Sequence, residues 1–501
     1  MIAGNTMEPS KHVPHLVPTL DRRSFLGVSL GSAAGLAAAG AIAPSLARAM
    51  QPDRPGGTPR GPGGKKALNV IFMVSDGMSF GTLSLAEIAS RVRDSKGTHW
   101  VELWGREGVK RSVMRTASAD SLVTDSSAAS SSWGCGVHIN NDAVNFTPDG
   151  KTPVPILVQA AQNAKATGLV TTTRLTHATP AGFIANCPSR NSEEEIGRQI
   201  IARKVDVALG GGSKYFPDSL LSKRPDLRVL RTHAEFDAYR VALGRAPSGP
   251  VLGMFQKSHC LYECERDNID PSLADMASLA LAQLSKHANG FVLQIEGGRV
   301  DHAAHANDAG AMVGEQLAFD RALGAVLSWM ENRDDTLLIV TTDHGNANPG
   351  LTLYGPDTYK GIERLCQVRH SFEWIFDQLG MKLQYDDAVA ATKLSEEDRV
   401  GSLVRAATGI QLGRDEIGAF VGALHNRNPQ LFEPMSRSSS VLGSCLANHY
   451  GVGFISPNHT ADFVEVTAIG PGSELIAPFI DNIELHGVMI GALDLRPAAP
   501  L

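Results

Sequence analysis

Short apolar segments of β-strand length recur along the chain and alternate with segments of helical pattern. The expected strands lie at residues 67–74, 168–173, 205–209, 291–295 and 336–340, and an amphipathic helix is expected at residues 156–166. Continuous apolar strands separated by helices are typical of a parallel sheet that is buried on both faces. We therefore predict an α/β fold, with a mostly parallel central sheet and helices on both faces.

The composition agrees with a large globular enzyme. Of the 501 residues, 43% are hydrophobic and 20% are charged, which excludes a predominantly disordered chain and a coiled coil. The chain has 46 basic and 52 acidic residues, a formal net charge of −6, and no basic block stands out. We therefore expect no nucleic-acid partner.

The N-terminal segment has the pattern of an export signal. Arg22 and Arg23 precede a weakly apolar Gly/Ala-rich run at residues 27–43, and Ala-Arg-Ala at residues 47–49 matches a cleavage site. This pattern resembles a twin-arginine signal, which directs folded proteins across the bacterial inner membrane. The alternative is an uncleaved membrane anchor, but the run is short and weakly apolar for a stable span.

These features divide the chain into three parts. We predict a twin-arginine-type signal peptide at residues 1–49, a Pro/Gly-rich linker at 50–66 and a catalytic domain at 67–501. No later stretch could span a membrane, so we expect a periplasmic or secreted protein without membrane contact after signal removal.

Six cysteines in an exported chain allow up to three disulfides, whose pairing the sequence does not decide. They are Cys135, Cys187, Cys260, Cys264, Cys366 and Cys445. Cys260 and Cys264 could pair locally or share a helix face. A structural zinc there is the weaker interpretation because no second Cys/His cluster lies nearby. Free or paired core cysteines are favoured.

Acidic, imidazole and hydroxyl groups follow several of the expected strands. They are Asp76, His177, Thr179, Glu296, Asp343 and His344. In open α/β sheets, ligands bind beyond the carboxyl ends of the strands. One such residue is usually an ordinary loop residue, but several placed alike predict a metal site.

Two spacings support more than one metal ion. Asp301 and His305 are four residues apart, so a helix would place both on one face, which suits zinc bound through oxygen and nitrogen. Glu296 lies five residues upstream of Asp301 at the end of a buried strand. Asp343 and His344 form an adjacent pair on a turn. Together these motifs indicate two or three metals.

Ser126 is the candidate nucleophile. Asp125 and Ser126 precede a run of small residues, so a helix could begin there and pack closely against a neighbour. A phosphoryl group is favoured at the positive end of such a helix. Without the metal motifs, a plain N-cap would be the simpler interpretation.

Taken together, these motifs resemble the alkaline phosphatase family of metal-dependent phosphomonoesterases over residues 66–501. The segments that carry the resemblance are residues 69–78 (NVIFMVSDGM), 123–129 (VTDSSAA), 176–181 (THATPA), 296–305 (EGGRVDHAAH), 342–345 (TDHG) and 458–460 (NHT). They occur in the family's order. The resemblance implies hydrolysis of small-molecule phosphate monoesters through a phosphoserine, release of inorganic phosphate, and a homodimer.

The resemblance also implies residue roles and two Zn²⁺ and one Mg²⁺ per chain. Ser126 would be the nucleophile, Arg190 would bind phosphate and Asp125 would orient Arg190. The metal sites would be Asp301, His305 and His459 for the first zinc, Asp343, His344 and Asp76 for the second, and Asp76, Thr179 and Glu296 for magnesium.

Two positions match only part of the family. Where the well-known enterobacterial type has an aspartate and a lysine near the third metal and the phosphate, this chain has His177 and His302, which looks like the animal type and some environmental bacteria. The identity of the third ion is therefore open. Residues 351–452, with helical patterns at 393–408 and 414–424, are expected to form an inserted cap or crown over the active-site face.

Two alternatives remain. A related phosphodiesterase or sulfatase would share the metal ligands, but no sulfatase C/S-x-P-x-R segment follows Asp76, and the diesterases typically lack an arginine that matches Arg190. A non-catalytic exported protein that binds metal or phosphate is disfavoured by the intact Ser126 and the full ligand set.

Overall fold

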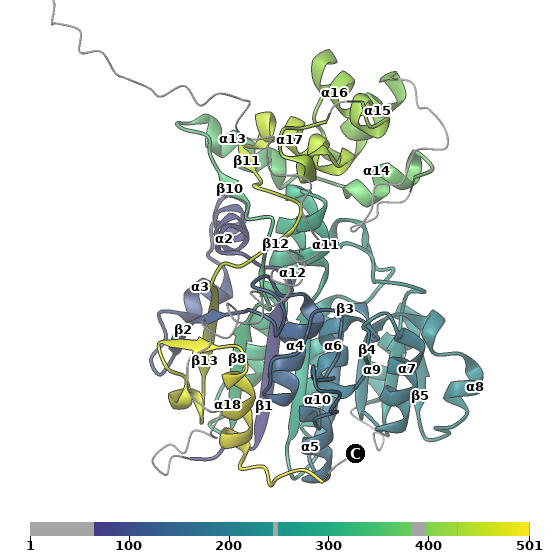
Figure 1. Cartoon of the computed structure of the whole chain (residues 1–501), viewed down its shortest axis with the longest axis vertical. Coiled ribbons are helices and arrows are strands. Elements are labelled where there is room, and N and C mark those ends of the chain that lie inside the picture. The colour runs from purple at the N-terminus through teal and green to yellow at the C-terminus, as the bar shows by residue number, and fades with distance from the viewer. Residues whose placement is uncertain (1–64, 244–248, 382–396, 428, 500–501) are drawn as a thin grey trace, which may run out of the picture. The chain divides into compact units, whose positions relative to one another are not determined.

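The computed structural model describes residues 65–243, 249–381, 397–427 and 429–499 (Figure 1). Its centre is a ten-stranded sheet with the order β14-β2-β13-β8-β1-β7-β3-β4-β6-β5. The strands are β1 (Asn69–Ser75), β2 (Lys110–Arg115), β3 (Ala166–Arg174), β4 (Val207–Gly211), β5 (Arg228–Leu230), β6 (Val251–Met254), β7 (Phe291–Gly297), β8 (Thr336–Thr341), β13 (Val464–Ile469) and β14 (Phe479–Asp481).

Only β13 runs antiparallel to its neighbours in this sheet, β8 and β2, so the predicted mostly parallel sheet is confirmed. Two small antiparallel pairs lie outside it. They are β9 (Gly345–Asn346) with β12 (His459–Thr460), and β10 (Gly350–Leu351) with β11 (Val452–Gly453).

Helices follow most of the strands. They are α2 (Phe80–Asp94), α3 (His99–Leu103), α4 (Ser126–Cys135), α5 (Ile156–Gln162), α6 (Ala178–Ile184), α7 (Glu193–Ala202), α8 (Asp218–Leu221), α9 (His233–Ala242), α10 (Leu273–Leu284), α11 (Arg299–His305), α12 (Ala309–Met330), α13 (Asp357–Leu365), α14 (Phe372–Gln378), α15 (Glu397–Thr408), α16 (Arg414–Leu424), α17 (Ser438–Tyr450) and α18 (Glu484–Leu493).

The central strand β1 shows why its middle residues, Val70 to Val74, are all apolar. All seven of its residues are buried, and it pairs with β7 on one side and β8 on the other. Phe72 belongs to a core cluster that includes residues of α4, α5, α6 and α18, whereas Ile71 and Met73 belong to one with α3, α10 and α12. Successive side chains therefore enter two cores, one on each face of the sheet.

A third core cluster lies among helices rather than on the sheet. Apolar side chains of α13 to α17 pack there with side chains of α2, α11 and α12. Helices α13 to α17 lie at the top of Figure 1, above the end of the sheet at which β3 is labelled. The expected helix at 414–424 is α16, and α15 covers the described part of the pattern at 393–408. That residues 351–452 are an insertion over the active-site face stays a prediction.

One sequence prediction of local structure needs correction. The helix expected at 156–166 ends at Gln162, because Ala164 adopts a left-handed conformation with φ of 59°, and β3 begins at Ala166. The strand expected at 205–209 lies at Val207–Gly211. It and the other expected strands agree with the structure to within two residues at each end. The predicted signal peptide, and the linker before Lys65, lie outside the described residues.

All six cysteines are free, so none of the possible disulfides is present. Burial raises the pKa of the Cys260 thiol to about 12, so this side chain stays a protonated, unreactive thiol at neutral pH. Among the described residues, no helix is long and apolar enough to cross a membrane.

Candidate active site

The carboxyl ends of the central strands bring the predicted site residues together. Val74 of β1 is paired in register with Glu296 of β7, and Thr171 of β3 is paired with Glu296 from the other side. Asp76 follows β1 directly, and its backbone N–H donates to the Gly297 carbonyl at 3.3 Å. The sheet edge therefore gathers acidic groups from strands that are far apart in the sequence.

One group consists of Asp301, His305 and His459. Asp301 and His305 lie on α11, as their spacing predicts, and the His305 Nε2 atom is 3.4 Å from Asp301 Oδ2. His459, on β12, has its Nε2 atom 3.5 Å from Asp301 Oδ1.

Hydrogen bonds to the two imidazoles show what this group can bind. His305 Nδ1 is 2.7 Å from the Pro457 carbonyl and His459 Nδ1 is 2.9 Å from the Thr124 carbonyl, so each Nδ1 carries the proton. The two Nε2 atoms are then both unprotonated, and their lone pairs face each other across 3.0 Å. A cation between them would satisfy both, and an N–H donated to a carbonyl on the far side is typical of metal-binding histidine.

A second group consists of Asp76, Asp343 and His344, all completely buried. His344 Nε2 lies 3.2 Å from Asp343 Oδ2 and 3.8 Å from Asp76 Oδ1, and neither oxygen has a hydrogen-bond partner among the described residues. Asp343 Oδ1 accepts from the Gly77 N–H at 2.9 Å. Gly77 has φ of 70°, and a Cβ there would lie 2.4 Å from Asp301 Oδ1, so the turn requires glycine.

A third group surrounds the other side of Asp76. The Thr179 hydroxyl donates to Asp76 Oδ2 at 3.3 Å. Glu296 Oε2 accepts from the Thr171 and Thr173 hydroxyls, whereas Glu296 Oε1 has no hydrogen-bond partner in the part of the chain that the structure describes. Donor atoms of Asp76, His177 and Glu296 lie within 4.8 Å of one another.

The three groups crowd negative charge into a buried volume. Burial, together with the charges of Asp343, Asp301 and Glu296, raises the pKa of Asp76 well above its ordinary value. Burial and Asp343 also raise the pKa of Glu296 to about 7, although hydrogen bonds from threonines oppose the shift. Buried carboxylates in contact are stable as ions only when cations neutralise them. The donor set therefore fits divalent metal ions.

Ser126 is the first residue of α4, as predicted. Asp125 is the N-cap of this helix, and its carboxylate accepts from the Ala128 N–H at 2.9 Å. The Ser126 hydroxyl is buried and lies 3.3 Å from His344 Nε2. The small residues of α4 allow close packing on α6, because a Cβ on Gly134 would lie 1.9 Å from the Gly182 carbonyl oxygen. This packing holds α4 closely against α6.

Arg190 reaches the same place from the loop before α7. Its Nη1 donates to Asp125 Oδ2 at 3.0 Å, as the predicted pairing requires, and its Nη2 is 3.3 Å from His177 Nε2. Burial opposes ionisation of Asp125, but Arg190 and hydrogen bonds, including the one from Ala128, hold the pKa of that carboxyl below its usual value. The guanidinium is thus held as a cation against Asp125, the residue before Ser126.

The sequence reasoning missed one residue, His259, in the loop after β6. Its ring centroid lies 4.4 Å from that of His302 and 5.6 Å from that of His177. The sequence did contain a signal for His259, because it is a polar side chain shortly after a buried strand, as the other site residues are. His259 belongs to none of the spacing motifs, however.

The model of the family described as alkaline phosphatase matches residues 67–495. The chain belongs to the alkaline phosphatase family. The predicted enzyme class, a hydrolase of phosphate monoesters, is confirmed with it.

Several alkaline phosphatases are similar over most of their length. Alkaline phosphatase 4 of Bacillus subtilis is 26% identical over 85% of this chain and 88% of its own. The alkaline phosphatase of Schizosaccharomyces pombe is 30% identical over 84% of this chain and 80% of its own. The crystal structure of Thermus thermophilus alkaline phosphatase superimposes with a TM-score of 0.78 at 31% identity, covering 90% of this chain and 97% of that one.

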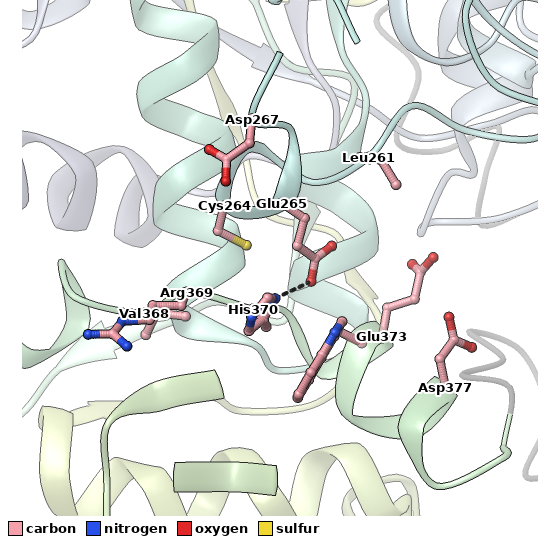
Figure 2. A pocket seen from close by; sticks show the side chains of 10 residues that line it. Leu261, Cys264, Glu265, Asp267, Val368, Arg369, His370, Glu373 and Asp377 are labelled. Carbon is pink, nitrogen blue, oxygen red and sulfur yellow. Dashed lines mark ion pairs between the residues drawn. The ribbon is translucent and has the colours of Figure 1, made fainter. Parts of the chain in front are cut away.

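A cavity of about 670 Å³ lies beside α14 (Figure 2). Its lining residues are Leu261, Cys264, Glu265, Asp267, Val368, Arg369, His370, Glu373, Trp374 and Asp377. None of these is a predicted metal or phosphate residue of the phosphatase. Glu373 on its wall forms an ion pair of 2.7 Å with Arg299, whose Nη1 is 3.4 Å from His302 Nδ1, and this chain of contacts links the cavity to the site.

Proposed function

We propose that this phosphatase cleaves phosphate monoesters with Ser126 as the nucleophile. The observation that carries the proposal is the position of the Ser126 hydroxyl. It lies at the N-terminus of α4, 3.3 Å from His344 Nε2, and the preceding residue, Asp125, pairs with the Arg190 guanidinium. Backbone N–H groups at a helix start favour a bound phosphoryl group.

In this proposal, Asp301, His305 and His459 hold one zinc, and Asp76, Asp343 and His344 hold the other. Mixed oxygen and nitrogen donors suit zinc, whereas the oxygens of Asp76, Thr179 and Glu296 suit magnesium. The proximity of His177 to this third group would favour zinc instead. When bound, the metals stabilise the attacking and leaving oxygens of an in-line displacement.

The chain's own groups account for the remaining chemistry. The Ser126 oxygen forms a bond to phosphorus while the bond to the ester oxygen breaks, and the alcohol leaves with a proton. Water then cleaves the phosphoserine, which releases inorganic phosphate and restores the hydroxyl. A serine hydroxyl needs activation for the first step, and the adjoining cation sites are suited to supply it.

Arg190 supports monoesters as the substrate class. A guanidinium fork binds two non-bridging phosphate oxygens at once. A monoester has three non-bridging oxygens, so two can bind the guanidinium while the third faces the cation sites, whereas a diester has only two and cannot make both contacts. The related diesterase is therefore the weaker of the two candidates.

The test compares turnover of an aryl phosphate with that of a bis-aryl phosphate diester, before and after treatment with a chelator. We expect monoester turnover to be much faster, to be lost with the metal and to return with zinc and magnesium. Faster diester turnover would favour the diesterase. Binding of zinc and phosphate without turnover of either ester would favour the non-catalytic alternative.

We further propose twin-arginine export to the periplasm or medium, and a homodimer. Exchange of Arg22 and Arg23 for lysines should leave the protein in the cytoplasm with its N-terminus uncleaved. Undiminished export of that variant would remove the twin-arginine interpretation. Light scattering of the metal-loaded protein tests the dimer, for which a monomeric mass is the contrary result.

A further inference from the structure

Three imidazoles meet beside the third metal group. The rings of His177, His259 and His302 have centroids 4.4 to 5.6 Å apart and lie nearly perpendicular to one another, with interplanar angles of 79° to 88°. In such edge-to-face packing, each ring limits how far its neighbours can rotate. The orientation of any one imidazole therefore depends on the other two.

Each imidazole also lies against a different arginine, and each arginine is paired with a carboxylate behind it. The three series are Asp125–Arg190–His177, Glu193–Arg174–His259 and Glu373–Arg299–His302. A guanidinium can only donate hydrogen bonds, so the ring nitrogen that faces it has to accept. Each imidazole therefore accepts from its arginine, and this contact limits the orientation of both groups.

The series that ends at His259 is anchored most firmly at its far end. Arg174 donates to Glu193 through Nε at 2.7 Å and through Nη2 at 2.8 Å. The hydroxyls of Thr176 and Tyr215 donate to the same carboxylate. Arg174 therefore holds Nη1 in place against His259 Nε2.

We propose that His259 is a positioning residue of the active site. Fixed by Arg174, its ring keeps His177 in the orientation in which the His177 Nε2 atom accepts from Arg190 Nη2. His259 thus acts on bound phosphate through Arg190, although it lies in none of the three metal groups. The proposal deepens the proposed function and rests on the role given there to Arg190.

The test is the affinity for inorganic phosphate, measured by titration calorimetry on zinc-loaded protein, with the Michaelis constant for an aryl phosphate as a second readout. We expect His259→Ala to raise the dissociation constant of phosphate and the Michaelis constant about tenfold, the lower end of the effect of residues that orient a ligand. Zinc content should be unchanged. His259→Gln should restore most of the affinity, because its amide oxygen can accept from Arg174.

Two comparisons separate positioning from general structural damage. His233→Ala removes a partly buried imidazole from α9, where His233 Nδ1 lies 2.7 Å from the Asn268 carbonyl, and should leave phosphate affinity unchanged. In an Arg190→Ala background, His259→Ala should have little further effect, because the group through which it acts is gone.

Wild-type phosphate affinity in His259→Ala, or an equal loss with and without Arg190, would overturn the proposal. If His259→Ala does not fold, His259→Leu carries the test, because leucine keeps bulk but cannot accept a hydrogen bond. Failure of the proposed function gives a different result from failure of the role of His259. If the proposed function is wrong, the wild-type protein lacks monoesterase activity, or Arg190→Ala binds phosphate normally.

Discussion

Exchange of Asp125 for asparagine should weaken phosphate binding and leave helix α4 in place. The two carboxylate oxygens of Asp125 have different tasks. Oδ1 caps α4 by accepting from the Ala128 N–H at 2.9 Å, whereas Oδ2 accepts from Arg190 Nη1 and the Asp142 N–H, both at 3.0 Å, and from the Ser127 hydroxyl at 2.7 Å. Asparagine keeps an oxygen for the cap, because it is as good an N-cap as aspartate, but it loses the charge that holds the guanidinium.

The size of the effect follows from these contacts. The Asp125 and Arg190 side chains are 19% and 23% exposed, so solvent screens their interaction only in part. A hydrogen bond to a charged group contributes about 1.5–3 kcal/mol, which corresponds to roughly 10- to 100-fold in phosphate affinity. Loss of the cap in Asp125→Ala should cost a further 0.5–2 kcal/mol, roughly, in stability.

Titration calorimetry with inorganic phosphate and thermal unfolding of the metal-loaded protein separate the two tasks. Asp125→Asn should lose affinity with little change in Tm, and Asp125→Ala should lose both. If asparagine lowers Tm as much as alanine does, or leaves affinity unchanged, the division of tasks between the two oxygens is wrong.

The pH dependence of stability gives a second check on Asp125. Its pKa is lowered in the folded protein, so its contribution is present above the unfolded value of about 4 and is lost as pH falls through the folded pKa. The acid side of the stability profile should therefore be flatter in Asp125→Asn.

The remaining predictions concern the nucleophile, the phosphate clamp and the third metal. Ser126→Ala should abolish most monoesterase activity with zinc content unchanged, and a phosphoserine trapped at another residue would contradict the assignment. Arg190→Ala should lower kcat/KM for a monoester by roughly 10- to 100-fold and for a diester far less; equal losses would exclude Arg190 as the clamp. The double variant His177→Asp with His302→Lys should bind magnesium and inorganic phosphate more tightly and turn over more slowly at alkaline pH. The aspartate adds a negative charge beside the metal ion, and the lysine adds a positive charge near the phosphate, whose release is then slower. Metal titration and phosphate inhibition measure this, and unchanged constants would refute it.

The sheet and the metal groups could be predicted because the signals are local. β1 is buried on both faces, so its sequence is apolar from Val70 to Val74, and this run indicates the length of the strand. Asp301 and His305 share one face of α11 because of their spacing alone. The N-cap role of Asp125 and the start of α4 at Ser126 follow from residue preferences within one turn.

The parts that escaped prediction depend on contacts between distant segments. Nothing within the loop that carries His259 indicates that its ring meets His302, because α11 and the strand order bring them together. The end of α5 was misplaced for a related reason. Residues 163–165 continue the helical pattern, but Ala164 turns the chain into β3, whose pairing with β7 begins at Ala166.

The metal groups also bear on folding itself, since the same carboxylates that would bind cations destabilise the metal-free protein. Burial raises the pKa of Glu296 to about 7, from an ordinary value of about 4.3, and the pKa of Asp76 rises as well. A carboxyl whose folded pKa is raised binds its proton more tightly in the folded state, so the metal-free protein should lose stability as pH rises from about 4.5 to 7. Bound metals select the ionised carboxylates, so the fall in stability between about pH 4.5 and 7 should flatten or reverse in the metal-loaded protein. Thermal unfolding across this range, with and without chelator, measures the difference. The same falling slope in both forms would show that these carboxylates are not neutralised by metal.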